Sequence, residues 1–396
     1  MHILFLCHFL PYSLARDSGR LDTFHYISSL SKQHAVSVIA FVSPEDENCL
    51  PEMQQICEEV VVLPYQENAL IPRLVRAWWR LLLPKVYGRN HSRAYRQALQ
   101  SLLERRHFDV VIVHGMMAEY GRYLKNTPKI LDEVDLFFMV AHQMFRKTGA
   151  LLPRFWAGFD WLRTLVWETH YLTVYDGVFV RSAKDESIVR DLVPQQKLAV
   201  LPPWFEGLAE LQQIPIERPP HNNLLFVGAM NIPSNVEAVT FFVQQVLPRI
   251  RAHVPDVQFY IVGSNPSPSV QRLGQEQGVI VTGEVPSLAP YYAAASVVVV
   301  PLFVGGGIIV KTLNGLASGR PVVTTAVGNS GTGAQQGRDL CLVSPDPQEM
   351  AITICDLLSN PNRWEQFANS GREFIRTHYD WKETVSGLTY FLRGIS

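Results

Sequence analysis

Hydrophobic residues follow two alternating patterns along the chain. Short, β-branched runs alternate with longer segments in which apolar residues recur every three or four positions, as they do on one face of a helix. In the first half we expect strands at 2–7, 35–42, 60–63, 110–114, 129–132, 177–181 and 198–201. Because parallel strands joined by helices give this alternation, the pattern predicts an α/β fold.

A proline-rich stretch without a clear period, residues 202–222, separates this half from a second α/β series. There we expect strands at 223–227, 257–262, 279–282, 297–301 and 322–324. A helix at 235–252 carries an apolar stripe, and Pro248 is expected to kink it. Further helices are expected at 347–359, 364–378 and 381–394. The predicted organisation is a domain at 1–203, a linker at 204–222, a second domain at 223–378 and a helical segment at 379–396.

Residues 297–325 have the order strand, glycine loop, helix, strand. The loop consists of Gly305, Gly306 and Gly307. A helix is expected from Ile308, and Gly319 ends it. The N–H groups and dipole at the start of such a helix favour an anion such as a phosphate, and Lys311 adds a positive charge on the same side. In the alternative interpretation the glycines only permit close packing of the helix on the sheet, which leaves Lys311 unexplained.

The loop after the first strand, residues 11–25, opens a helix. Asp17 or Ser18 is expected as its N-cap, and Gly19 is expected at the turn. Loops at the carboxyl ends of parallel strands commonly face the ligand crevice, so Arg20 is a candidate for contacting a phosphate or an acceptor group. A solvated surface arginine is the alternative.

Polar residues also follow two later strands of the first half. His114 ends the strand 110–114, and Asp132 and Asp135 follow the next expected strand in the same way. The carboxyl ends of parallel strands are where sites gather, although a lone histidine is as often structural. The histidines of the chain show no metal-binding spacing.

Residues 73–106 contain nine basic residues and one acidic residue, with Trp78 and Trp79 among leucines. This composition suits a helix on an anionic membrane surface, and it also suits an ordinary amphipathic helix pair. A second aromatic and basic stretch, residues 145–171, is expected to form a long helix. That helix either adds to the membrane interpretation or lines a pocket for an acceptor.

The amino-acid composition limits the classes of function that this protein can have. The formal net charge of −1 does not indicate a nucleic-acid partner. Five scattered cysteines without C-x-x-C spacing indicate thiols in a reducing compartment. Prolines and glycines interrupt the uncharged stretch 285–310, so no membrane span is expected there, and residues 1–11 are expected to form a strand rather than a secretory signal. We therefore expect a cytoplasmic protein, with contact at the inner membrane face left open.

Several short motifs occur in a fixed order: Pro11 with 17–20, then 109–114, 225–230 with Pro233 and Asn235, 261–263, 281–285, and 301–323. Their order and spacing resemble the retaining, GT-B-fold glycosyltransferases of family 4, and in particular bacterial sugar transferases linked to exopolysaccharide systems. The resemblance implies two Rossmann-like domains that face a cleft, with the last helix crossing back to the first domain.

The resemblance also implies roles for individual residues. A nucleotide-diphosphate-sugar donor would be held by Gly228, Gly263, Gly283, Glu284, Val285, Gly305, Gly306, Gly307, Ile308, Lys311 and Asn314. The implied catalytic residues are His114 and Lys311, and acceptor-side or phosphate contacts fall to Ser18, Gly19, Arg20 and Asp135. No metal or other cofactor is expected, so a lysine and helix termini would stabilise the departing diphosphate.

Three departures from the family pattern bear on activity. Gly306 and Asn314 stand where many relatives carry two glutamates, and Ile309 stands where arginine is frequent. A basic pair is often found after the strand that ends at Gly228, and residues 229–235 contain no Arg or Lys. An amide in place of the second carboxylate would weaken a hydrogen bond from a ribose hydroxyl by about 1 kcal/mol.

Two functions are compatible with these residues. The first is a retaining, metal-independent glycosyltransferase that moves a sugar from a nucleotide-diphosphate sugar to a glycan, a lipid-linked acceptor or a small molecule. The second is a catalytically degenerate GT-B protein that binds a glycan or a partner without turnover. A sugar epimerase of similar shape is disfavoured, because its usual acidic and histidine site residues have no counterpart here.

Overall fold

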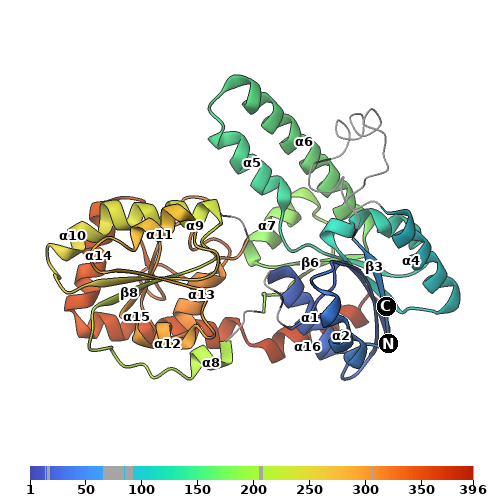
Figure 1. Ribbon diagram of the computed structural model, residues 1–396. Coiled ribbons are helices and arrows are strands. Elements are labelled where there is room, and N and C mark those ends of the chain that lie inside the picture. Colours follow the sequence, from blue (N-terminus) through green and yellow to red (C-terminus); the bar gives the residue numbers. More distant parts are fainter. Residues whose placement is uncertain are drawn as a thin grey trace. The chain divides into compact units, whose positions relative to one another are not determined.

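A computed structural model of the chain describes residues 1–13, 15, 18–65, 84, 92–204, 208–305 and 307–395. These residues form two units, which we call unit 1 and unit 2 (Figure 1). Unit 1 comprises Met1–Trp204 and Trp381–Ser396, and unit 2 comprises Phe205–Asp380.

Unit 1 is built on a seven-stranded sheet in the order β3-β2-β1-β4-β5-β6-β7. All neighbouring strands pair in parallel. The strands are β1 His2–Phe9, β2 Ala35–Val42, β3 Glu59–Pro64, β4 Val110–His114, β5 Lys129–Asp132, β6 Gly177–Val180 and β7 Leu198–Val200. The central strands are buried on both faces, which explains their continuous apolar sequences.

Helices cover both faces of this sheet (Figure 1). The helices of unit 1 are α1 Ser18–Leu30, α2 Leu50–Ile56, α4 Arg93–Arg105, α5 Phe137–Lys147, α6 Leu151–Val174, α7 Ala183–Leu192 and α16 Trp381–Arg393, of which α5 and α6 extend away from the sheet (Figure 1). Two short 3₁₀ segments, Glu47–Cys49 and Gly115–Tyr123, complete the connections. The expected single helix at 145–171 is wrong at its start, because residues 148–150 separate α5 from α6.

Helix α16 belongs to unit 1 although it follows all of unit 2 in the sequence. Leu388 and Leu392 are buried in the same core as the apolar side of α1. The Trp381 ring stacks on Tyr26 with 5.0 Å between ring centroids, and it lies 4.9 Å from the Trp204 ring. This apolar and aromatic contact holds α16 on the face of the sheet that α1 covers.

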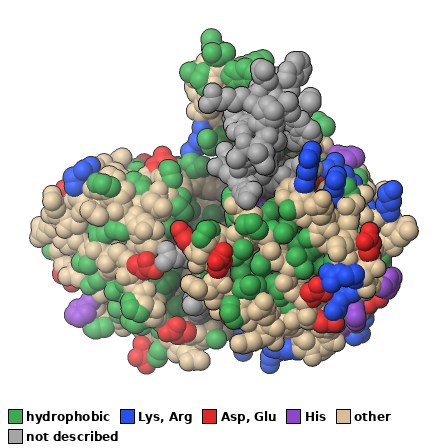
Figure 2. Space-filling model, turned by 45° about the vertical axis from the view of Figure 1, so that its right-hand side comes forward, with side chains coloured by type: hydrophobic (Ala, Val, Ile, Leu, Met, Phe, Trp, Pro, Cys, Tyr) green, Lys and Arg blue, Asp and Glu red, His purple; other side chains and the backbone are tan. Residues whose placement is uncertain are grey.

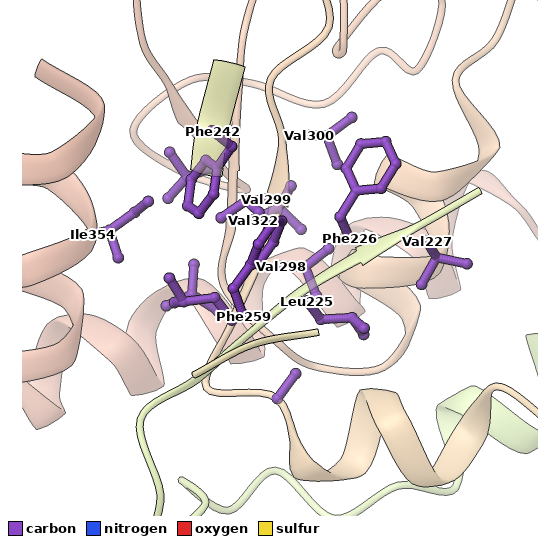
Figure 3. Packing of buried hydrophobic residues seen from close by; sticks show 14 of the residues in the cluster. Leu225, Phe226, Val227, Phe242, Phe259, Val298, Val299, Val300, Val322 and Ile354 are labelled. Carbon is purple, nitrogen blue, oxygen red and sulfur yellow. The ribbon is translucent and has the colours of Figure 1, made fainter. Parts of the chain in front are cut away.

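Unit 2 is built on a six-stranded parallel sheet in the order β10-β9-β8-β11-β12-β13. Its strands are β8 Asn223–Val227, β9 Gln258–Val262, β10 Val279–Gly283, β11 Val297–Val300, β12 Val322–Thr324 and β13 Cys341–Leu342. Figure 3 shows Phe242 and Phe259 packed beside the valines of β11, with 4.5 Å between the two ring centroids. The expected α/β class with parallel sheets is confirmed, and β13 is a strand that the pattern did not reveal.

The helices of unit 2 are α8 Leu208–Gln212, α9 Pro233–Phe241, α10 Leu247–Arg251, α11 Pro268–Leu273, α12 Ala289–Ala294, α13 Val310–Ala317, α14 Pro347–Ser359 and α15 Pro361–His378. The expected helix at 235–252 is interrupted by a π-helical turn, Phe242–Val246. Pro248 has no N–H group, so the helix lacks the backbone hydrogen bond that this residue would donate. The π-helical turn just before Pro248 is wider than an α-helical turn and adjusts the backbone to this loss. Part of the expected linker is structured, because α8 buries Leu211 in the core of unit 2.

The packing of α13 on its sheet can be tested at Gly315. A Cβ there would lie 2.7 Å from Val322 Cγ2 and 3.1 Å from Val298 Cγ1. We expect Gly315→Ala to lower the free energy of unfolding of unit 2 by about 1–2 kcal/mol, because overpacking outweighs the gain in helix propensity. Urea denaturation measures this change.

Gly387→Ala in α16 is the matched control. No atom outside its immediate neighbourhood lies within 4 Å of a Cβ at Gly387. Alanine should therefore stabilise unit 1 by up to about 1 kcal/mol. A Gly315→Ala variant that gains stability in the same way would contradict the close contact of α13 with β11 and β12.

Candidate functional site

Three glycines lie side by side where the strands of unit 2 end. Gly228 follows β8, Gly263 follows β9, and Gly283 ends β10. The Gly228 N–H donates to Val262 O (3.0 Å), and the Gly263 N–H donates to Gly283 O (3.1 Å). Gly263 has φ +144°, and a Cβ there would lie 2.0 Å from Gly228 O, so only glycine fits. The structure thus brings these three predicted residues together as half-buried backbone.

Lys311 reaches this edge from the first turn of α13. Its ammonium group donates a hydrogen bond to Asn235 Oδ1 and lies 4.6 Å from the centroid of the Phe226 ring. Asn235 is fixed in turn, because its Nδ2 donates to Ala229 O (2.9 Å). The lysine is half-buried, and a Cβ at Gly228 would lie 3.1 Å from Nζ. The amine therefore occupies space that only glycine leaves open.

Burial lowers the pKa of Lys311 to about 7, since an ammonium ion loses hydration at this position. Among the residues that the structure describes, no carboxylate forms an ion pair with it. Its neighbours are an amide oxygen and an aromatic face, which stabilise a cation only partly. An anionic ligand at this edge would restore the charged form.

The glycine loop lies between β11 and α13. Gly307 has φ +62°, and Gly331 packs so closely against it that a Cβ at Gly331 would lie 2.9 Å from Gly307 O. Ile309 stands at the N-cap position of α13 without a capping side chain. The first N–H groups of α13 therefore remain suited to an anion. Gly305 is described, whereas Gly306 lies outside the described residues.

Asn314 lies one turn beyond Lys311 on α13 and is 8% exposed. Its Oδ1 atom and the hydroxyl of the fully buried Tyr292 are polar atoms without a hydrogen-bond partner in the described part of the chain. Burial raises the pKa of Tyr292, and the Asn314 side chain beside it opposes that shift. Asn314, which stands where many relatives carry a glutamate, is therefore a polar side chain inside the core of unit 2.

The remaining donor-side residues flank this edge. Glu284 is exposed just after Gly283, whose backbone has φ +72° and open space around it. Val285 and Ile308 are partly buried and pack against the core. The structure places these side chains but does not assign them a role, so their contact with a donor stays a prediction.

In unit 1, His114 stands at the carboxyl end of β4, in register with Asp132 of β5. His114 Nδ1 accepts a hydrogen bond from the Met116 N–H (3.3 Å). The neutral ring therefore carries its proton on Nε2. This geometry is compatible with the predicted role of His114.

A buried charge network lies at the same edge and was missed from the sequence. Arg181 Nη2 lies 2.8 Å from Asp132 Oδ1, and Arg181 Nε lies 3.7 Å from Asp22 Oδ2. Its guanidinium lies 5.5 Å from the Tyr26 ring centroid. An arginine directly after an apolar strand was the available signal, because a buried arginine requires carboxylate partners.

Glu133 is the second residue that sequence reasoning missed. It is 5% exposed, and its carboxyl oxygens lie 2.9 and 3.0 Å from the Cβ position of Gly115, which follows His114. Burial, and then repulsion from Glu168 and Asp132, raise its pKa well above the usual value. Burial therefore favours the neutral acid form of Glu133, the form that can donate a hydrogen bond.

Asp135 also has a raised pKa, about 6, because of burial and then the charge of Asp185. Arg20 forms an ion pair with Asp46 (2.8 Å) and lies over the rings of Phe9 and Tyr12. Arg20 is therefore paired within unit 1 rather than a freely solvated surface arginine, and its contact with a phosphate or an acceptor stays a prediction.

The predicted turn before α1 is wrong. Ser18 and Gly19 already lie in helix α1, so Ser18 is its first residue rather than its N-cap. Asp17 lies outside the described residues, as does most of the basic stretch 73–106. In the described part of that stretch, Arg105 and Arg106 form ion pairs with Glu58 and Glu59.

The described residues lack two features. They contain no cluster of His, Cys, Asp or Glu arranged to hold a metal ion. None of the helices in the described ranges combines the length and hydropathy needed to cross a membrane.

Part of unit 2 is similar in sequence to a known protein family. Residues 221–360 match the family model described as "Glycosyl transferases group 1". A protein of Klebsiella pneumoniae, named "Uncharacterized 44.6 kDa protein in cps region", is 25% identical over 177 residues, which are 42% of this chain and 45% of that protein. The chain thus matches less than half the length of this curated relative.

Solved structures share the fold over nearly the whole chain. Sucrose-phosphate synthase from Thermosynechococcus elongatus has a TM-score of 0.70 at 18% identity and covers 100% of this chain and 99% of its own. Alr3699/HepE of Anabaena, solved in complex with UDP and glucose, has a TM-score of 0.64 at 13% identity and covers 99% of both chains. The predicted GT-B fold and the resemblance to this family are confirmed.

The lowered pKa of Lys311 makes the stability of unit 2 depend on pH. The pKa is about 7 in the folded chain and 10.5 for a free side chain. Between these values the unfolded chain binds more protons, so stability rises with pH, by at most about 1.4 kcal/mol per pH unit. Below pH 7 both states hold the proton and the dependence ends.

The variant Lys311→Met keeps the length of the side chain and removes the amine. We therefore expect the unfolding free energy of the wild type, minus that of the variant, to rise between pH 7 and pH 10.5. Urea denaturation at several pH values measures this difference. A difference independent of pH would show that Lys311 has an ordinary pKa.

Proposed function

We propose that this chain is a glycosyltransferase that moves a sugar from a nucleotide-diphosphate sugar to an acceptor, with the donor held by unit 2. The observation that carries the proposal is the Lys311 ammonium, held beside Gly228 and the uncapped first turn of α13. Breaking the donor's bond between the sugar and the diphosphate leaves negative charge on the leaving group. A lysine and helix N–H groups fixed in advance stabilise that charge.

The comparisons support the donor side of this proposal. The matched range 221–360 contains all the donor-side residues from Gly228 to Asn314. Solved structures of similar fold contain UDP or UDP-glucose. We infer that Gly283 to Val285 contact the base through their backbone, and that the glycine loop and Lys311 contact the diphosphate and the sugar.

On the acceptor side we infer that His114 donates from Nε2 to a hydroxyl of the transferred sugar. Glu133, whose raised pKa favours the neutral acid beside Gly115, would bind an acceptor or sugar oxygen as a second donor. The reaction would retain configuration, with attack on the face that the leaving group departs from and without a metal ion. The match to a protein of a cps region supports a glycan or lipid-linked acceptor in polysaccharide synthesis. Contact of the 73–106 stretch with the inner membrane face stays part of this proposal.

Lys311→Met should lower the transfer rate about 100- to 1000-fold, because one fixed positive charge at the leaving group is lost. A panel of nucleotide sugars, with released nucleotide diphosphate detected by mass spectrometry, identifies the donor and gives the rate. Arg272→Met is the matched control, since Arg272 is an exposed basic residue of the same unit.

Rates that fall equally in both variants, or in neither, would contradict the role of Lys311. A wild type that releases no nucleotide from any donor, while a close relative does so under the same conditions, would favour the degenerate binding protein. The missing carboxylate at Asn314 is the observation behind that alternative.

Asn314→Glu should tighten donor binding about fivefold, which corresponds to the ~1 kcal/mol gained when a charged acceptor replaces an amide. Isothermal titration with the donor's nucleotide diphosphate measures the dissociation constant. Asn314→Gln is the control, because it adds the same length without the charge. Equal or weaker binding by the Glu variant than by the Gln variant would mean that Asn314 does not face the ribose.

A further inference from the structure

Helices α5 and α6 of unit 1 form a hairpin that extends away from its sheet (Figure 1). The base of the hairpin is anchored, because Phe138 and Leu172 are buried in the core. The buried carboxylate of Glu168 accepts a hydrogen bond from the Phe138 N–H (3.1 Å) at the start of α5. The far end therefore projects from a fixed support.

The two helices also hold each other. The Phe145 and Trp161 rings stack with 5.8 Å between centroids, and His142 lies 4.6 Å from the Trp161 ring. Gly158 allows this approach, since a Cβ there would lie 3.1 Å from the Phe145 ring. The hairpin thus has its own packed interior, and its outer side chains are not needed for its fold.

Its far end carries apolar side chains that nothing in the described chain covers. The exposed fractions are 88% for Leu151, 70% for Leu152, 65% for Phe155 and 49% for Trp156. The exposed apolar surface continues along the hairpin through Val140, Met144, Leu162 and Val166. Only three other large hydrophobic residues are exposed in the described ranges: Ile232, Ile352 and Tyr390. Figure 2 shows hydrophobic side chains gathered at this end of the molecule.

The charge at this end has one sign. No acidic residue occurs from Leu136 to Phe159, while Arg146, Lys147 and Arg154 are exposed beside the apolar side chains. The first acidic residue beyond, Asp160, forms an ion pair with Arg163. Apolar and aromatic side chains flanked by basic residues match the interface of an anionic bilayer.

We propose that the hairpin tip, which we define as residues 144–156, inserts into the headgroup region of an anionic lipid bilayer. All six residues at the start of α6, 151–156, are exposed, so the described residues cover no side of this segment. A bilayer surrounds an inserted tip, whereas a flat protein surface covers one side only. Because α6 is not apolar enough to cross a membrane, the insertion is shallow. This inference does not depend on the proposed transferase activity.

Flotation of the full chain with lipid vesicles tests the proposal. We expect binding to vesicles of phosphatidylcholine mixed with phosphatidylglycerol, and much weaker binding to phosphatidylcholine alone. The variant with Leu151, Leu152, Phe155 and Trp156 all changed to Ser should lose at least about tenfold in affinity, because shallow insertion depends on buried apolar area. The matched control changes two equally exposed apolar residues elsewhere, Ile352→Ser and Tyr390→Ser, and should bind as the wild type.

A second pair of variants separates charge from insertion. Changing Arg146, Lys147 and Arg154 to Gln should weaken binding about fivefold per residue on the anionic vesicles, and added salt should remove this difference. The control changes three exposed basic residues elsewhere, Lys32, Lys125 and Arg272, to Gln.

Three results would overturn the proposal. They are a wild type that floats with neither vesicle, a tip variant that binds as the wild type, and a loss of binding that the control variants share. Sedimentation equilibrium without lipid tests the other possible occupant of the tip, which is a second copy of the chain. A wild type that self-associates, with tip variants that are monomeric, would assign the tip to a second copy of the chain and contradict insertion.

Discussion

The carboxyl end of β8 must accommodate a lysine amine, and the donor side of unit 2 depends on this constraint. A Cβ at Gly228 would lie 3.1 Å from Lys311 Nζ and 2.8 Å from Asn235 Nδ2, so glycine leaves the necessary space. Asn235 supplies an uncharged acceptor and Phe226 an aromatic face. Burial then lowers the pKa to about 7. An anion at this edge would stabilise the ammonium form, as the proposed transfer of a sugar from a diphosphate requires.

In unit 1 the buried arginine is paired with carboxylates of the same unit. Arg181 is flanked by Asp132 and Asp22, so most of the charge at the edge of this sheet is balanced within the protein. Burial first, and then repulsion from Glu168 and Asp132, raise the pKa of Glu133, and one guanidinium does not offset this. In the proposed function Glu133 and His114 face sugar hydroxyls rather than phosphates.

Most of the fold was predictable because parallel strands buried on both faces have uninterrupted apolar sequences. The strands Val110–His114 and Lys129–Asp132 have the expected bounds, and the glycine loop before α13 lies where the pattern put it. β13 was missed because a strand of two residues is too short to show a repeating hydrophobic pattern. The Arg181 network and Glu133 were missed because their partners come from distant segments, which only the folded sheet brings together. The pKa of Lys311 likewise depends on residues far away in the sequence.

The most direct test of the donor site follows the protonation of Lys311 itself. It is the only lysine in residues 205–380, so NMR of ¹³C-labelled lysine side chains, compared with Lys311→Met, assigns its signal. We expect this lysine to titrate near pH 7 in the free protein and at clearly higher pH once the donor's nucleotide diphosphate is bound, because the anion stabilises the ammonium form. A signal that titrates near the ordinary value of 10.5, or one that saturating nucleotide leaves unchanged, would contradict the account.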